Sequence, residues 1–180
     1  LVDENTVNKL RAAGLRSENA LNTFLVARFL LPFLFSTLAA VWVFGLGNLA
    51  GRGMPIRLFA VIGIGYLGFY APNIYISNRM GKRQHSIKRA WPDALDLMLI
   101  CVESGISIEA AMRRVSEELG EQSPALAEEM VLTTAELSFL PDRRVALENL
   151  AMRTQIELVR SVTQALIQAD RYGTPVAQAL

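Results

Sequence analysis

The chain has 180 residues, of which 52% are hydrophobic and 19% are charged, and its formal net charge is only +1. That near-zero total hides a split, because residues 1–90 hold 11 Lys and Arg against 3 Asp and Glu, whereas residues 91–180 hold 7 against 14. An acidic C-terminal half without a basic patch argues against nucleic-acid binding, and a single cysteine, Cys101, excludes an intramolecular disulfide.

Residues 1–28 are expected to form short juxtamembrane helices in the cytoplasm. Val7, Leu10 and Ala13 share one helical face before Gly14 interrupts it. Ser17 is then placed to cap a helix that leads into the next segment. We interpret the first helix as one that lies at the membrane interface, and the alternative is a docking site for a partner.

Two uncharged apolar runs follow, over residues 29–50 and 58–78. As helices they would be roughly 33 and 31 Å long, which matches the hydrocarbon thickness of a bilayer. The linker 51–57 is too short for a domain, so the two runs predict a transmembrane hairpin over residues 29–78. The flanks carry nine Lys and Arg and the linker only two. The positive-inside rule therefore predicts a multi-pass protein with both visible termini in the cytoplasm.

The second run contains a glycine pattern typical of dinucleotide sites, Gly63-Ile-Gly65-Tyr-Leu-Gly68. A nucleotide site needs a preceding strand, a following helix and an acidic residue about 20 positions further on. Here the pattern lies inside an apolar run, and the next acidic residue is Asp93. We interpret these glycines as small residues that allow close helix packing.

Residues 79–90 predict a basic stalk, which anionic lipid headgroups would attract. His85 lies in this segment and is the only histidine of the chain. It therefore has no histidine partner for a metal site or a catalytic pair.

Residues 91–180 predict an acidic helical domain in the cytoplasm, with no competing β pattern. Pro92 is expected to open its central helix, which would run to Glu103 and be buried on most sides. Start signals for the later helices are Ser107, Ser123, Asp142, Thr154 with Glu157, and Thr174. The predicted fold class is all-α, with an N-terminal transmembrane helical hairpin followed by a cytoplasmic antiparallel bundle of about six short helices.

Apolar residues at helical spacing predict which faces of this bundle point inward. The expected inward residues are Ile108, Ala111, Met112, Val115, Leu119, Leu126, Met130, Leu137, Val145, Ala146, Leu150, Leu158, Val162 and Leu166. On the outer face, Glu109 with Arg113 and Arg114 with Glu118 are expected to pair. Exposed charges on the second and third helices are candidate partner contacts, and the residues chosen are Arg113, Arg114, Glu117 and Glu128.

No set of residues in the sequence assembles into a catalytic, cofactor or metal site, and we predict no enzyme, no cofactor and no metal. A phosphate-binding Gly-Lys-Ser/Thr loop is absent, and no histidine or cysteine pair could complete a zinc set or a nucleophilic triad. Asp93, Asp96 and Glu103 form a stripe that could act as paired carboxylates in a membrane hydrolase. We interpret this stripe as a solvated or partner-facing edge.

Two motifs carry a family resemblance. Trp91-Pro-Asp-Ala-Leu-Asp-Leu-Met98, followed by Cys101-Val-Glu-Ser-Gly-Ile-Ser-Ile-Glu-Ala-Ala-Met112, resembles the type II secretion system F-domain family. The Cys-Val-Glu before the glycine resembles its TadC-like branch, from tight-adherence (Flp) pilus systems. Gly173-Thr-Pro-Val-Ala-Gln-Ala-Leu180 is similar to the family's second signature. The resemblance covers residues 91–180 and supplies no catalytic residues.

The resemblance implies a noncatalytic platform protein in the bacterial inner membrane. Its cytoplasmic domain would couple a hexameric secretion ATPase to pilin extraction and pilus assembly, beside a companion platform subunit of the same family, as part of an oligomer. The alternative, suggested by a weak internal repeat at spacings near 34 residues, is a membrane-tethered helical-repeat adaptor for an unrelated cytoplasmic client. The chain begins with Leu1 and ends at Leu180 inside an expected sixth helix, so we expect a longer protein.

Overall fold

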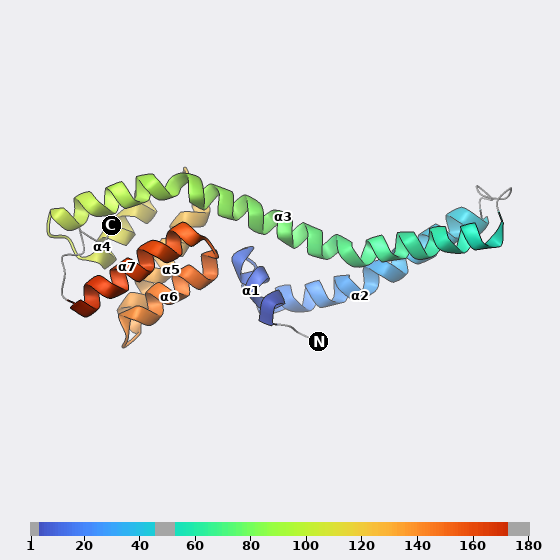
Figure 1. The fold of residues 1–180 in the computed structure, drawn as a ribbon, viewed down its shortest axis with the longest axis horizontal. Coiled ribbons are helices and arrows are strands. Elements are labelled where there is room, and N and C mark those ends of the chain that lie inside the picture. Colours follow the sequence, from blue (N-terminus) through green and yellow to red (C-terminus); the bar gives the residue numbers. More distant parts are fainter. Residues whose placement is uncertain (1–3, 46–52, 173–180) are drawn as a thin grey trace. The chain divides into compact units, whose positions relative to one another are not determined.

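In a computed structural model of the protein, residues 4–45 and 53–172 are described (Figure 1). Every regular element in these ranges is helical and none is a strand, which confirms the all-α prediction for this part of the chain. The chain divides into two compact units, Leu1–Arg79 and Met80–Leu180. Helix α3 (Met54–Glu103) contributes residues to both units. The end of the first apolar run, the linker up to Arg52, and the segment from Gly173 onward, which includes the start expected at Thr174, lie outside the described residues.

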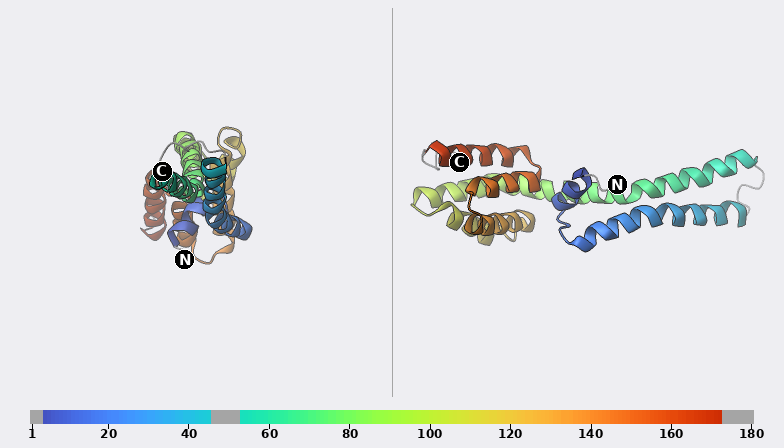
Figure 2. Two further views of the ribbon diagram at one scale, coloured as in Figure 1. Left: turned by 90° about the vertical axis from the view of Figure 1, so that its right-hand side faces the viewer. Right: turned by 90° about the horizontal axis from the view of Figure 1, so that it is seen from below.

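The first unit contains α1 (Glu4–Ala12), α2 (Glu18–Ala40), a π-helical turn (Val41–Gly45) and the first part of α3. Gly14 adopts a φ of 79°, which only a residue without a Cβ adopts readily, and it ends α1 as expected. The Ser17 side chain accepts a hydrogen bond from the Asn19 N–H at 3.3 Å, which confirms the predicted cap of α2. Figure 2 shows α2 and the first part of α3 running side by side.

Two helices of the described residues are long and apolar enough to cross a membrane. The candidate spans are Leu21–Phe44 and the helix Met54–Glu103, and only 11% of the most apolar window of each is buried. Large apolar side chains such as Phe33 and Phe59 are 74% and 77% exposed. A core helix of a soluble domain would bury such side chains, so this exposure favours contact with lipid.

Two of the three glycines in the Gly63–Gly68 motif lie where α2 and α3 approach each other. A Cβ on Gly68 would lie 3.1 Å from the Leu31 carbonyl oxygen, and a Cβ on Gly65 would collide with the Ser36 side chain. A Cβ on Gly63 would meet nothing within 4 Å. Helix packing therefore accounts for Gly65 and Gly68, but Gly63 has no such role.

We expect Gly68→Val to destabilise the α2–α3 pair, whereas Gly63→Val should leave it unchanged. The valine at position 68 must push against backbone, and overpacking of this kind costs about 1–3 kcal/mol. Thermal unfolding of the detergent-solubilised protein, with cysteine cross-linking between α2 and α3 as a local probe, measures the difference. Equal effects of the two substitutions would show that the glycines do not set the helix spacing.

The second unit is a bundle in which the C-terminal part of α3 packs with four shorter helices (Figure 1). These are α4 (Ile108–Glu118), α5 (Pro124–Phe139), α6 (Arg143–Thr154) and α7 (Glu157–Tyr172). α4 packs on α5, α5 on α6, and α6 on α7. The largest fully buried apolar side chains come from α3 to α7 and are Ile87, Met98, Met112, Val115, Leu126, Met130, Leu150 and Val159.

The expectation that a new helix begins at Pro92 is wrong, because α3 continues through it. Pro92 itself is exposed, while its neighbours Trp91 and Ala94 are buried on the face that meets the bundle. A proline inside a helix costs about 3 kcal/mol or more. Ile87, within the predicted stalk, is also buried on this apolar face. Burial of the face offsets the cost of the proline.

Three of the residues predicted to start helices of the bundle are confirmed as caps, and Thr154 is not. The Ser107, Ser123 and Asp142 side chains accept hydrogen bonds from backbone N–H groups at the starts of α4, α5 and α6, as expected. Thr154 does not cap α7. It is the buried last residue of α6, its hydroxyl donates to the Leu150 carbonyl at 2.9 Å, and Gln155 then turns the chain with a φ of 53°.

The predicted inward faces are correct for α4 and α5 and shifted in part for α6 and α7. Ala111, Met112, Val115, Leu126, Met130, Leu137, Ala146, Leu150 and Leu166 are buried, and Ile108, Leu119 and Val162 pack against this core. Val145 and Leu158 are exposed instead, and their neighbours Leu147 and Val159 are buried. In α7 the rest of the predicted stripe still faces the core, and only its first member differs, because apolar spacing alone did not distinguish Leu158 from the adjacent Val159.

Candidate functional site

An open groove lies between α4 and α5 in the second unit. Its volume is about 520 Å³, and its lining residues are Arg113, Ser116, Glu117, Val131, Thr134, Ala135, Ser138 and Phe139. Val131 is more than half exposed and the Phe139 side chain is 87% exposed. A groove with an apolar floor and an ionic edge is the usual form of a protein-binding surface.

The four predicted partner-contact residues do not form one cluster in the structure. Arg113 and Glu117 come together at the edge of the groove, with 3.5 Å between Arg113 Nε and Glu117 Oε1. Arg114 pairs with Glu118 at 2.5 Å, which confirms that expected pair, but neither residue lines the groove. The Glu128 carboxylate instead contacts Arg83 of α3 at 2.6 Å.

The expected pair between Glu109 and Arg113 is wrong. Glu109 accepts from Arg143 at 2.7 Å, because the first residue of α6 reaches the first turn of α4. Partial burial by itself would raise the pKa of Glu109, but hydrogen bonds from its backbone N–H, the Ser107 side chain and Arg143 outweigh it, and the pKa is lowered. Glu109 therefore remains ionised at neutral pH and ties α4 to α6.

Sequence reasoning missed a buried ionic network that links three helices. The Glu129 side chain of α5 is 1% exposed, and its two carboxylate oxygens accept hydrogen bonds from Arg83 of α3 and Arg153 of α6, each at 2.9 Å. Arg153 also donates to Glu136 at 2.5 Å and to the Thr133 hydroxyl at 2.9 Å. Both oxygens of the buried Glu129 side chain therefore have hydrogen-bond partners, as burial of a polar group requires.

Both arginines of this network have a raised pKa. Burial lowers the pKa of Arg83 and Arg153, but hydrogen bonds from their guanidinium groups to Glu128, Glu129 and Glu136 outweigh it. The arginines therefore stay charged and bonded over the whole physiological pH range. Such saturated pairing suits a structural role, since no proton is available for transfer near neutral pH.

The Asp93, Asp96, Glu103 stripe is exposed along α3. Asp93 accepts a hydrogen bond from the Gln122 side chain at 3.1 Å, which places it against the turn before α5. Among residues 4–45 and 53–172, no group of three or more His, Cys, Asp or Glu residues could hold a metal ion. His85 is exposed on α3 and far along it from Cys101, which is buried.

These observations define the class of the protein as a helical bundle attached to two candidate membrane helices. Residues 94–180 match the family model described as Type II secretion system (T2SS), protein F. This match covers the bundle from Ala94 of α3 onward and includes α4 to α7. No curated protein and no solved structure matches the chain.

Proposed function

We propose that this protein is a noncatalytic platform subunit of a bacterial inner-membrane pilus or type II secretion-like machine, of the TadC-like tight-adherence branch. Proteins with the matched domain are noncatalytic inner-membrane platform proteins that work with secretion ATPases and pilus components. The observation that carries the proposal is the match over residues 94–180, preceded in the same chain by two candidate membrane spans. Both visible termini are proposed to be cytoplasmic.

In this proposal the bundle couples a hexameric cytoplasmic secretion ATPase to pilin extraction and pilus assembly. A companion platform subunit of the same family, pilin and the lipid bilayer are the other partners, within an oligomer. The ionic network around Glu129 supports such a role, because it cross-links α3, α5 and α6 and so stiffens the bundle against a mechanical load. A rigid bundle can transmit displacement, whereas a loosely packed one would absorb it.

The proposed ATPase-facing surface is the α4–α5 groove with the charges around it. Arg113 and Glu117 form its edge, and Arg114 lies on the same exposed helix. Glu128 is exposed, but its carboxylate is held by Arg83, so we give it a smaller share in binding. Charged residues at the rim of an interface act mainly through association rate and specificity.

The test is the double charge reversal Arg113→Glu with Arg114→Glu. We expect recovery of the secretion ATPase with the affinity-purified protein to fall about tenfold or more, because two like-charge contacts replace two favourable ones. Piliation of the cells should fall with it. Both residues are exposed and their partners Glu117 and Glu118 are on the surface, so the bundle should keep its far-ultraviolet circular dichroism spectrum and melting temperature.

The matched control is Lys88→Glu with Arg89→Glu, which makes the same charge change at exposed positions of α3 in the same unit. This control should recover normal amounts of ATPase. If ATPase recovery and piliation survive the Arg113 and Arg114 reversal, the groove is not the coupling surface. Recovery of an unrelated cytoplasmic client in place of the ATPase would instead support the alternative hypothesis, a membrane-tethered helical-repeat adaptor.

A further inference from the structure

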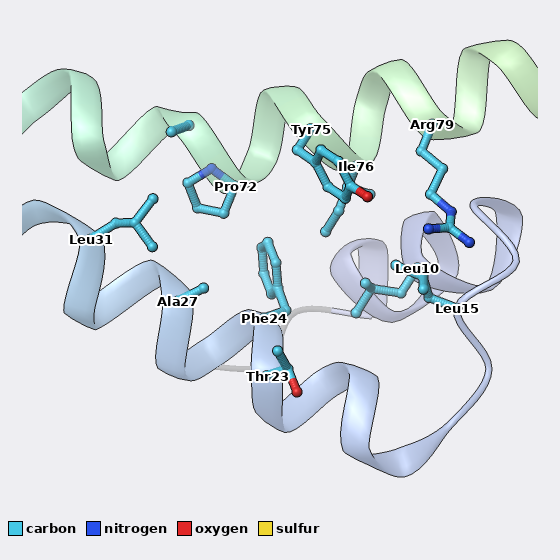
Figure 3. A pocket seen from close by; sticks show the side chains of 11 residues that line it. Leu10, Leu15, Thr23, Phe24, Ala27, Leu31, Pro72, Tyr75, Ile76 and Arg79 are labelled. Atoms are coloured by element: carbon cyan, nitrogen blue, oxygen red, sulfur yellow. The ribbon is translucent and has the colours of Figure 1, made fainter.

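An apolar cavity lies within the first unit, between α1, α2 and the first part of α3 (Figure 3). Phe24 and Leu31 of α2 and Pro72 and Ile76 of α3 line it, and Leu10 of α1 borders it. Its volume is about 520 Å³, within the range of roughly 300–1,000 Å³ that small-molecule sites occupy. Because the walls are almost entirely hydrocarbon, the chemistry that fits them is an alkyl chain.

One charged side chain lines the cavity. Arg79 of α3 points toward α1 in Figure 3, and its Nε donates a hydrogen bond to the Ala13 carbonyl oxygen at 3.3 Å. This bond orients the guanidinium group, and no described residue accepts a hydrogen bond from its two terminal nitrogens. A guanidinium oriented in this way presents two parallel N–H donors, the geometry that binds a phosphate group.

The cavity lies at the charged end of the two candidate spans. Arg28 immediately precedes the uncharged run of α2, and Arg79 immediately follows that of α3. Arg28 packs over the Phe69 ring at 4.8 Å, and Tyr75 lines the cavity, as expected of residues at a membrane interface. Exposed Lys9 and Arg11 on α1 add positive charge on this side. Positive charge at headgroup depth attracts anionic lipids.

We propose that this cavity is a binding site for one anionic glycerophospholipid, with an acyl chain between α2 and α3 and its phosphate on Arg79. The apolar walls account for the chain and Arg79 accounts for the headgroup. The site goes beyond the platform role and requires only that α2 and α3 cross a membrane. A lipid bound there would bridge α1 and the hairpin, because Leu10 of α1 and Arg79 of α3 both line the cavity.

The test is native mass spectrometry of the detergent-solubilised full chain, titrated with dioleoyl-phosphatidylglycerol or with dioleoyl-phosphatidylcholine. The two lipids share their acyl chains and their phosphate, but choline cancels the net negative charge. We expect one phosphatidylglycerol to bind about tenfold more tightly than phosphatidylcholine, because the choline ammonium of phosphatidylcholine competes with Arg79 for the phosphate and leaves the headgroup without net negative charge. Inorganic phosphate at the same concentration should not displace the lipid, because it cannot fill the apolar part.

Three variants separate the parts of the site. Arg79→Gln should remove the preference for phosphatidylglycerol, and Arg79→Lys should restore part of it, since a point charge still attracts the headgroup. Lys82→Gln is the matched control, because it removes the same charge three residues along α3 from an exposed side chain that does not line the cavity. Ala27→Phe should weaken binding of both lipids by filling the cavity.

Two results with the lipids would overturn the proposal, and a third comes from inorganic phosphate. One is equal binding of the two lipids by the wild-type protein. The other is the same loss in Lys82→Gln as in Arg79→Gln, which would mean that general surface charge, not this site, attracts the lipid. Displacement by inorganic phosphate would also contradict it. The Arg79 variants change no apolar wall residue, so they decide the matter even if Ala27→Phe does not fold.

Discussion

Replacing Glu129 by alanine should lower the free energy of unfolding of the bundle by about 3–5 kcal/mol. Glu129 is buried at 1% exposure, and its loss leaves Arg83 and Arg153, each only 13% exposed, as poorly compensated buried charges. A typical domain is stable by about 5–15 kcal/mol, so this is a large share of the total. Urea unfolding followed by Trp91 fluorescence in a Trp42→Phe background reports on the bundle, because Trp91 is in its core.

The neighbouring carboxylate provides the control. Glu128 bonds to the same arginine, but its side chain is 44% exposed, so Glu128→Ala should cost less than about 1 kcal/mol. Equal losses in the two variants would mean that the network contributes no more than a surface salt bridge. The proposed stiffness of the bundle would then need another source.

Local chemistry made much of the bundle predictable. Ser107, Ser123 and Asp142 cap helices because their short side chains reach backbone N–H groups two or three residues ahead, a relation that the sequence displays directly. The Arg114–Glu118 pair follows from helical spacing alone. The small size of Gly63, Gly65 and Gly68 within an apolar run also predicted close helix packing, which the structure supports for Gly65 and Gly68 but not for Gly63.

Relations between distant residues could not be predicted in this way. Arg83 and Glu129 are 46 positions apart, and nothing in the basic segment 79–90 distinguishes a side chain that enters the bundle from one that faces lipid headgroups. The pair between Arg143 and Glu109 is another case. The two residues are distant in the sequence, so helical spacing predicted the pair of Glu109 with Arg113 instead. The prediction that a helix begins at Pro92 was wrong because burial of Trp91 and Ala94 against the bundle outweighs the local helix-breaking preference of proline.

The candidate binding surface shows the same division. Sequence identified Arg113 and Glu117 as exposed charges on one helix, and the structure brings them to the groove. It could not identify Val131 or Phe139, because their exposure depends on how α5 is rotated against α4. In a largely apolar helix, the sequence does not distinguish an exposed phenylalanine from a buried one. The apolar residues of the groove could therefore not be identified from the sequence.

Replacing Phe33 by arginine should prevent α2 from inserting into a membrane. Phe33 is near the middle of the candidate span Leu21–Phe44 and is 74% exposed. On the insertion scale the change from Phe to Arg at a span centre costs about 3–4 kcal/mol, which is a factor of more than 100 in the ratio of inserted to non-inserted helix. A translocon insertion assay with glycosylation acceptors on both sides of α2 measures that ratio.

The control for Phe33→Arg is Asn22→Arg, at an exposed position near the end of the same span. There the arginine can extend to the headgroup region, so insertion should stay close to the wild-type value.

The two hypotheses for α2, a membrane-spanning helix and a surface helix of a soluble protein, make opposite predictions for the Phe33→Arg protein. If α2 were a surface helix of a soluble protein, an added arginine would improve solubility without detergent and leave folding intact. If α2 crosses the bilayer, the Phe33 variant should fail to reach the membrane, and the platform role and the lipid site would both be lost with it.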